Sequence, residues 1–328
     1  MLTVVFMPRP LRIEYPGAVY HVMNRGNYRA ELFCQETAGA SFEGTLFQAC
    51  SRFGWRLCAY VLMSNHYHLA LETRDANLVA GMQWLQSTFA NRFNRMVRDR
   101  GHVFQGRYKA LLIEADSSLL RVVNYIHLNP VRAGLVTVET LKDYPLSSFP
   151  KFFLRKRPAC LDNADWLSAA GHLKPTVAGM RAYHRSLAVA VEGDIAKRDE
   201  LYRQLCRGWY IGTRDGKRAL LKDLERGRAG RDAQIDLYGF GEDRAELLLE
   251  KGLKRLRKTT EDLERDRKLM PWKVVLASWI KAQCGVSNRW FSETMRMGTI
   301  YNISRALSEE RKHGNRKKGT WRALITTK

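Results

Sequence analysis

The sequence lacks several features that would assign it to a common class of protein. Its six cysteines are scattered and form no C-x-x-C pair, which argues against a zinc ribbon and against the disulfide framework of a small secreted protein. No hydrophobic run approaches the length of a membrane span. The apolar first six residues carry no basic segment of the kind that opens a signal peptide. These absences favour a protein of the reducing cytoplasm.

Acidic residues are also few. The chain of 328 residues has 33 Asp and Glu against 55 Lys and Arg, which gives a net charge of +22. Residues 1–150 hold 16 basic and 11 acidic side chains, so the excess is concentrated in residues 151–328, which hold 39 and 22. A protein this basic usually binds a polyanion, most often nucleic acid. We therefore expect the second half to supply most of the affinity for a polyanion.

No glycine-rich phosphate loop follows any predicted strand, which argues against a doubly wound parallel sheet. Strand-like patterns instead alternate with helical spacing of apolar residues. The predicted strands are 18–24, 55–63, 66–72 and 103–114, and the predicted helices are 38–53, 78–96 and 117–128, the last stopped by Pro130. This order predicts an α+β fold, a ferredoxin-like antiparallel or mixed sheet with helices on one face.

Two prolines and a basic segment mark a boundary near residue 150. We expect a catalytic domain over 1–150, a charged helical extension over 151–268, and a third segment over 269–328. In the third segment, two short helices joined by a turn at Gly298 resemble a helix-turn-helix. A small helical bundle with a basic tail fits the pattern equally well.

The stretch 65–71 contains the first candidate site. His66 and His68 are two residues apart on a predicted strand, so their side chains share one face. Two imidazoles at this spacing can bind one divalent ion. Such pairs are also often hydrogen-bonded structural residues, and the pair alone leaves both interpretations open.

A second candidate site lies at the end of the helix over 117–128. Tyr125 and Asn129 are four residues apart, so a phenol and an amide project from the same helical face. For this pair taken alone, a capping Asn before proline and a half-buried Tyr are the simpler explanation.

Together, the two stretches resemble the HUH single-tyrosine nucleases. Within that superfamily, the similarity is to the REP-associated tyrosine transposases, bacterial relatives of the IS200-type transposases. The matching segments are 10–21, 24–27, 60–68, 103–109 and 125–135, so the resemblance covers residues 8–150. It implies an HUH nuclease fold.

The resemblance also implies a reaction. Tyr125 would attack a phosphodiester of single-stranded DNA beside a hairpin-forming repeat, leaving a 5′-phosphotyrosine and a free 3′-hydroxyl. Covalent catalysis of this kind conserves the energy of the broken bond for strand transfer. His66, His68 and Asn129 would hold Mg²⁺ or Mn²⁺, although more distant relatives have Gln where this chain has the shorter Asn129.

Five further residues are implied in DNA binding. Arg12, Arg25 and Asn27 would bind a short guide sequence beside the hairpin, and Arg107 and Lys109 would contact phosphates. For Arg107 and Lys109, ordinary surface charge is an equally good explanation. His21 matches a family position, and a buried structural role is the simpler interpretation for it.

Three functions remain open at this stage. The leading one is a metal-dependent nicking and strand-transfer enzyme of the bacterial cytoplasm, associated with the nucleoid and acting as a monomer or homodimer. The basic C-terminal region would then bind duplex DNA, and its removal would weaken DNA binding and flatten its salt dependence. The alternatives are a catalytically silent DNA-binding regulator and a metal-dependent hydrolase. The intact set of His66, His68 and Tyr125 argues against the first, and the lack of acidic residues near the histidines against the second.

Overall fold

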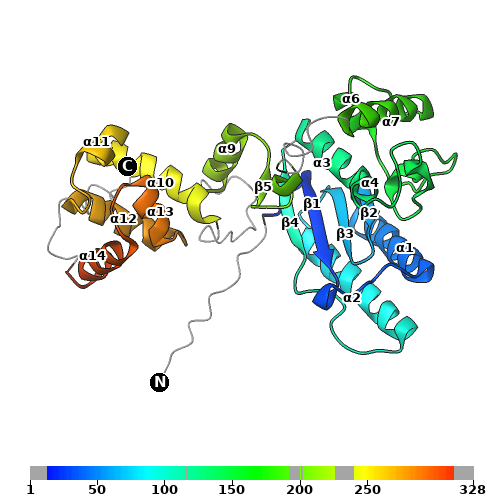
Figure 1. The fold of residues 1–328 in the computed structure, drawn as a ribbon, viewed down its shortest axis with the longest axis horizontal. Helices are drawn as coiled ribbons and strands as arrows, with labels where there is room; N and C mark the ends of the chain where they lie inside the picture. Colours follow the sequence, from blue (N-terminus) through cyan, green and yellow to red (C-terminus); the bar gives the residue numbers. More distant parts are fainter. Residues whose placement is uncertain (1–12, 115–116, 192–199, 201, 226–239, 314–328) are drawn as a thin grey trace. The chain divides into compact units, whose positions relative to one another are not determined.

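A computed structural model describes residues 13–114, 117–191, 200, 202–225 and 240–313 (Figure 1). The chain divides into two compact units, one over Arg12–Lys217 and the other over Arg218–Lys328. The division falls within helix α9 (Arg214–Glu225). Each unit is described by itself below.

A five-stranded sheet forms the centre of the first unit, with the strand order β2-β3-β1-β4-β5. β1 is antiparallel to β3 and to β4, and β2 is antiparallel to β3. The strands are β1 (Ala18–Arg25), β2 (Trp55–Leu62), β3 (His66–Thr73), β4 (Lys109–Ile113) and β5 (Tyr210–Ile211). The helices between the first four strands are α1 (Glu36–Phe53) and α2 (Leu78–Val97). The first four strands and these two helices have the ferredoxin-like connectivity, so the predicted α+β class is confirmed.

Local chemistry explains where these elements end. α1 ends at Gly54, whose φ of +65° is a left-handed conformation that glycine adopts without steric cost, and β2 begins at the next residue. The predicted strand over 103–114 shortens to β4, because residues 103–108 form a turn with Gly106 at a φ of +66°. The shorter strand places Arg107 in the turn and Lys109 at the first position of β4.

Pro130 acts differently from the prediction. α3 (Ser117–His127) ends before it, but Pro130 lies in the first turn of a second short helix, α4 (Asn129–Arg132). Proline is tolerated there because the first N–H groups of a helix have no intrahelical partner. The break at Leu128 leaves Asn129 buried close to the end of α3.

Helices cover both faces of the sheet, so the prediction of helices on one face is wrong. On one face Tyr67 of β3 packs against Phe42 of α1, with ring centroids 4.8 Å apart, and accepts a hydrogen bond from Gln86 of α2. On the other face His68 packs edge-on against Tyr125 of α3, at 5.1 Å. The alternation of side chains along β3 sends these neighbours to opposite faces, and the α3 face is the one that carries the candidate site.

Residues from Leu141 onward complete the first unit. The elements there are the 3-10 helix η2 (Leu141–Asp143), α5 (Ser148–Lys151), α6 (Ala164–Ala169), α7 (Val177–Val191) and β5, which pairs parallel to β4; the other 3-10 helix of the unit is η1 (Asn27–Arg29). His127 of α3 is buried between Ser148 Oγ and Tyr183 Oη, each 3.0 Å from a ring nitrogen. Trp166 and Tyr183 are buried as well. The predicted boundary near residue 150 therefore falls inside this compact unit.

The described part of the second unit is helical. Its helices are α10 (Gly241–Leu256), α11 (Thr260–Arg265), α12 (Pro271–Gln283), α13 (Asn288–Thr294) and α14 (Ile300–His313). They share an apolar core that includes Leu276, Phe291 and Ile303, all fully buried. Ser287 caps α13, and Gly298, at a φ of +91°, lies in the turn before α14. The two predicted short helices and the turn between them are confirmed.

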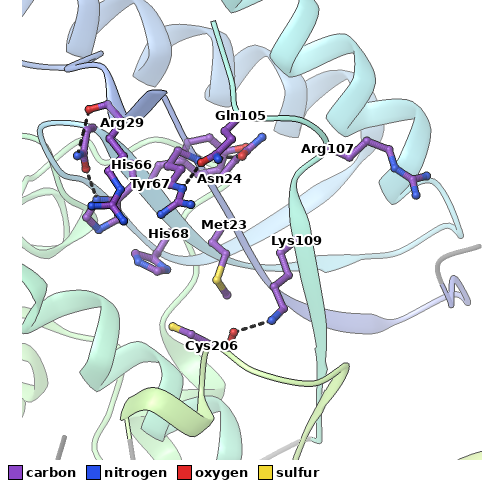
Figure 2. Close-up of a pocket in the computed structure, with 12 residues that line it drawn as sticks. Met23, Asn24, Arg29, His66, Tyr67, His68, Gln105, Arg107, Lys109 and Cys206 are labelled. Atoms are coloured by element: carbon purple, nitrogen blue, oxygen red, sulfur yellow. Dashed lines mark hydrogen bonds between the residues drawn. The ribbon is translucent and has the colours of Figure 1, made fainter. Parts of the chain in front are cut away.

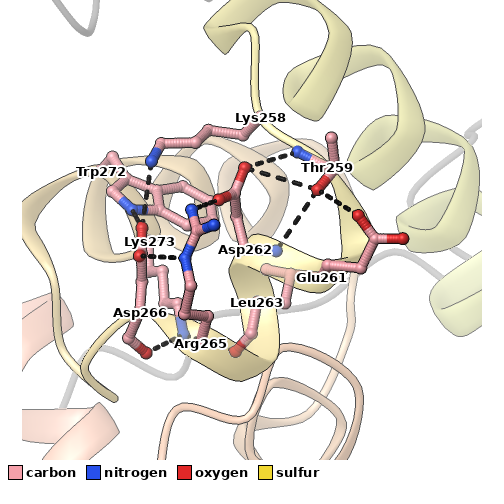
Figure 3. A network of polar contacts seen from close by, with 9 residues as sticks. All are labelled: Lys258, Thr259, Glu261, Asp262, Leu263, Arg265, Asp266, Trp272 and Lys273. Atoms are coloured by element: carbon pink, nitrogen blue, oxygen red, sulfur yellow. Dashed lines mark hydrogen bonds and ion pairs between the residues drawn. The ribbon is translucent and has the colours of Figure 1, made fainter.

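A polar network fixes the turn between α10 and α12 (Figure 3). Thr259 and Asp262 form a capping box at the start of α11. The ammonium of the buried Lys273 donates to the carbonyl oxygens of Leu263, at 2.7 Å, and Asp266, at 2.9 Å. The carboxylate of Asp266 in turn accepts from Trp272 Nε1 at 3.0 Å. The buried polar groups of this turn hold its backbone in place.

Within the described residues, no helix combines the length and the apolar character that a bilayer span requires.

Candidate active site

Two histidines of β3 line an open cavity of about 790 Å³ in the first unit (Figure 2). His66 and His68 lie on the same face of the strand, and their ring centroids are 5.2 Å apart. Nδ1 of His66 lies 2.8 Å from Oδ1 of Asn65. An amide oxygen only accepts hydrogen bonds, so this contact places the proton of His66 on Nδ1 and leaves Nε2 with a free lone pair.

Tyr125 of α3 meets His68 across this face of the sheet. Its hydroxyl oxygen is 3.4 Å from Nε2 of His68. Asn129 is also buried, and its amide nitrogen donates to the carbonyl oxygen of Tyr125 at 2.9 Å. The structure therefore brings together all four residues for which the sequence predicted catalysis or metal binding.

Burial dominates the electrostatics of these residues. It lowers the pKa of His66, takes the pKa of His68 well below 6.5, and raises the pKa of Tyr125 above 10. Asn129 and the guanidinium of Arg132 act against the increase at Tyr125. At neutral pH the imidazoles are therefore neutral and able to bind a cation, whereas the phenol keeps its proton and is a weak nucleophile.

The fit of a divalent ion can be judged from the donor atoms. Metal–nitrogen distances are about 2.1 Å, so two rings whose centroids are 5.2 Å apart can both reach one ion. The bond from Asn129 to Tyr125 uses the amide nitrogen and leaves the oxygen, which is the ligand atom, outside that contact. Across the ranges that the structure describes, no group of three or more His, Cys, Asp or Glu side chains forms a metal site. Two imidazoles, an amide oxygen and an open cavity nevertheless fit an ion that also binds phosphate oxygens.

Comparison with known proteins finds similarity in the region that contains the candidate site. Residues 15–129 match the family described as "Transposase IS200 like". This part of the chain is therefore similar to the IS200-like transposases. A Haemophilus influenzae protein named as a REP-associated tyrosine transposase is 28% identical over 119 residues, which cover 33% of this chain and 66% of that protein. A solved structure of a REP-associated tyrosine transposase bound to a REP hairpin is 20% identical and covers 48% of this chain and 92% of that one, with a TM-score of 0.37. The resemblance inferred from the sequence motifs is confirmed.

The region that matches the transposase family presents basic side chains at the cavity. Arg25, Arg29, Arg107 and Lys109 are among the lining residues. Arg25 Nε donates to Gln105, and Lys109 Nζ donates to the carbonyl oxygen of Cys206 at 2.7 Å. In Figure 2 the guanidinium of Arg107 extends away from the two histidines.

The other two residues predicted to bind DNA are Asn27 and Arg12. Asn27 is outside the lining of the cavity, and its backbone N–H donates to the carbonyl oxygen of Val103. Arg12 lies outside the described residues.

A segment that follows the matched region covers Tyr125. The thiol of Cys206 lies 3.2 Å from the hydroxyl oxygen of Tyr125, and the ring of Tyr202 lies 5.3 Å from that of Tyr125. The guanidinium of Arg132 lies over both tyrosine rings. Cys206 lines the cavity, whereas Tyr125 is only 6% exposed and does not. Cys206 thus lies between Tyr125 and the open cavity.

The contacts of Tyr202 and Cys206 were not predicted from the sequence, whereas the buried structural role expected of His21 is confirmed. Nε2 of His21 lies 3.0 Å from Nδ1 of His68. Its position on β1 was a usable signal, since His21 and Met23 are two residues apart and Met23 pairs with His68. For Tyr202 and Cys206 no local pattern was available, because both contacts join residues about 80 positions apart.

Proposed function

We propose that this protein nicks and rejoins single-stranded DNA with Tyr125 as the nucleophile. The observation that carries the proposal is the 3.4 Å approach of the Tyr125 hydroxyl to Nε2 of His68, on the sheet face that bears both histidines. Oη of Tyr125 would bond to the phosphorus of a phosphodiester, and the bond from that phosphorus to the 3′-oxygen would break. The products are a 5′-phosphotyrosine and a 3′-hydroxyl, and the reverse reaction joins strands without ATP.

We propose His66, His68 and Asn129 as the residues that hold a divalent cation, Mg²⁺ or Mn²⁺. When bound, the ion supplies a positive charge that polarises the scissile phosphate and holds it in line with the nucleophile. The pairing of Nδ1 with Asn65 leaves Nε2 of His66 to bind the ion, and the hydroxyl of Tyr125 lies 3.4 Å from Nε2 of His68. A phosphate that bridges to the ion would therefore lie next to the attacking oxygen.

The proposed substrate is a single strand next to a hairpin, as the relative solved with a REP hairpin suggests. Arg25, Arg107 and Lys109 at the cavity would contact its phosphates. We further propose that Arg12 and Asn27 bind the adjacent guide sequence. The protein would act as a monomer or homodimer.

For the second unit we propose duplex DNA binding through the helix pair α13 and α14. Tyr301 is 77% exposed and Ile300 52% exposed at the start of α14, whereas Ile303 and Leu307 are buried in the core. A helix that buries one face and presents an aromatic and polar residues on the other has the arrangement of a recognition helix in the major groove. We place this DNA-binding activity in the bacterial cytoplasm, at the nucleoid.

One observation favours a second function, a DNA-binding regulator without catalysis. Tyr125 is covered by Tyr202 and Cys206, and burial raises its pKa. A protein that only bound hairpins would tolerate a nucleophile covered in this way. A nicking enzyme must uncover the hydroxyl when DNA enters the cavity.

The test uses the full-length protein with labelled single-stranded oligonucleotides that carry the palindromic repeats flanking its own gene. With Mn²⁺ or Mg²⁺ present, denaturing gels should show a protein–DNA adduct that disappears in Tyr125→Phe. Tyr202→Phe, which removes the neighbouring hydroxyl and keeps the ring, is the matched control and should still form the adduct. Tight hairpin binding without any adduct would support the regulator. Cleavage that persists in Tyr125→Phe would support the hydrolase.

A further inference from the structure

Behind the metal-binding face, four groups follow one another in hydrogen-bonding distance. The carbonyl oxygen of Leu205 lies 2.9 Å from Nδ1 of His21. Nε2 of His21 lies 3.0 Å from Nδ1 of His68, and Nε2 of His68 lies 3.4 Å from the hydroxyl of Tyr125. His21 is fully buried and His68 is 4% exposed, so water does not compete for these contacts.

The carbonyl of Leu205 at one end determines which atom donates in each hydrogen bond of this series. A carbonyl oxygen only accepts, so Nδ1 of His21 carries the proton. In a neutral ring the other nitrogen, Nε2, is then an acceptor, and its partner must donate. The proton of His68 is therefore on Nδ1, and Nε2 of His68 keeps a lone pair on the side of Tyr125.

We propose that His21 is a positioning residue that selects the Nδ1–H tautomer of His68, with the Leu205 carbonyl as its anchor. This inference rests on the proposed function for the use of that lone pair, which binds the metal ion. The other tautomer would place a proton on Nε2 and prevent it from acting as a ligand.

His66 supports the assignment independently. Its Nδ1 is paired with the amide oxygen of Asn65 at 2.8 Å, which selects the same tautomer by a different partner. Both histidines of β3 therefore carry the proton on Nδ1 and keep the lone pair on Nε2. The partner that fixes this is Asn65 for His66 and His21 for His68. Such outer partners typically fix the tautomer and orientation of a metal-binding histidine.

The anchor lies outside the matched region of the transposase family. Leu205 follows residue 129 by 76 positions, and the same segment contributes Tyr202 and Cys206 to the cover over Tyr125. The segment that covers Tyr125 therefore also helps to select the tautomer of His68, through the carbonyl of Leu205.

The first test reads the tautomer directly. Long-range proton–nitrogen NMR of the metal-free, full-length protein distinguishes Nδ1–H from Nε2–H, and the spectrum of His68→Gln identifies the signals of His68. We expect Nδ1–H in the wild type, Nε2–H or a mixture in His21→Leu, and recovery in His21→Gln, whose side-chain oxygen can accept from Nδ1 of His68. An Nε2–H tautomer in the wild type would overturn the proposal, as would Nδ1–H retained in a folded His21→Leu.

The second test measures Mn²⁺ binding by calorimetry without DNA. His21→Leu should bind Mn²⁺ about 10- to 100-fold more weakly than the wild type, the usual effect of losing an outer partner of a metal ligand. His21→Gln should recover most of the affinity. If His21→Leu fails to fold, the wild-type tautomer and the Gln variant still decide the question. An absent DNA adduct in the wild type would refute the nicking function and leave the tautomer result standing.

Discussion

Both units of this protein bury polar side chains, but the contacts of those side chains differ. In the second unit, the buried Lys273 donates to two backbone carbonyl oxygens, and Asp262 caps a helix. In the first unit, His68 and Tyr125 contact each other and other side chains beside an open cavity. Burial of a charged or titratable group is thus no sign of a site by itself. The sign is a group of buried titratable side chains that contact one another beside a cavity.

The units also differ in how much of the chain each requires. The matched region ends at residue 129, whereas the compact first unit continues to Lys217. Its last part supplies the aromatic residues Trp166 and Tyr183 and the cover over Tyr125. The second unit has its own apolar core. We therefore expect truncation to damage the first unit if the chain is cut at the sequence-based boundary, and to spare it if the chain is cut after α9.

The largest effect on nicking should come from the position at which the chain is truncated. A chain ending at residue 150 should lose nicking entirely, since it lacks Leu205 and Cys206 and exposes His127 and Phe149, which Trp166 and Tyr183 cover. A chain ending at Glu225 should still form the adduct. Its affinity for duplex DNA should fall by about tenfold or more at 0.15 M salt, with a flatter salt dependence. Adduct gels and binding titrations at several salt concentrations test both chains.

Nicking by the 150-residue chain would show that the downstream segment is dispensable. If the affinity of the 225-residue chain for duplex DNA had an unchanged salt dependence, the second unit would not contribute to DNA binding.

Loss of a proposed metal ligand should have the next largest effect. His68→Gln should reduce nicking by at least about 100-fold, more than the loss of an outer partner, and should change hairpin affinity only slightly. Lys273→Met is the matched change in the second unit. It removes a buried polar group that the backbone holds, so nicking by the folded protein should stay near the wild-type rate. Single-turnover rates at saturating protein measure both variants. Equal losses of nicking rate in the two variants would contradict the difference inferred between the units.

A smaller effect is expected from the core of the second unit. Phe291 is fully buried there, and Phe291→Ala should destabilise that unit by about 3–5 kcal/mol through the lost contacts and the cavity left behind. Denaturant unfolding should show an early transition that involves only this unit, while adduct formation survives. A single cooperative transition that moves together with the loss of nicking would show that the two units do not fold independently.

The smallest effect concerns one phosphate contact at the cavity. Arg107→Ala should weaken hairpin binding about three- to tenfold and reduce the slope of log affinity against log salt by about one. Arg74→Ala, an exposed arginine that does not line this cavity, is the control. Equal losses of affinity in the two variants would mean that only the overall charge matters.

Much of the fold and part of the site could be predicted from the sequence. Alternation along 66–72 placed His66 and His68 on one face, and helical spacing placed Tyr125 beside Asn129, because both depend on neighbouring residues. Periodicity does not report which sheet face a helix covers, so the position of α3 opposite α1 and α2 was missed. The contact of His21 with Leu205 could not be predicted, since Leu205 is 184 residues away and contributes only a backbone carbonyl.

The measurement that tests the central claim most directly is the chemical identity of the DNA adduct. Full-length protein would be incubated with Mn²⁺ and a hairpin-bearing single strand, digested, and examined by mass spectrometry. We predict a 5′-phosphate esterified to Tyr125, together with a released strand that ends in a 3′-hydroxyl. Attachment at any other residue, or cleaved DNA with no protein attached, would contradict the account.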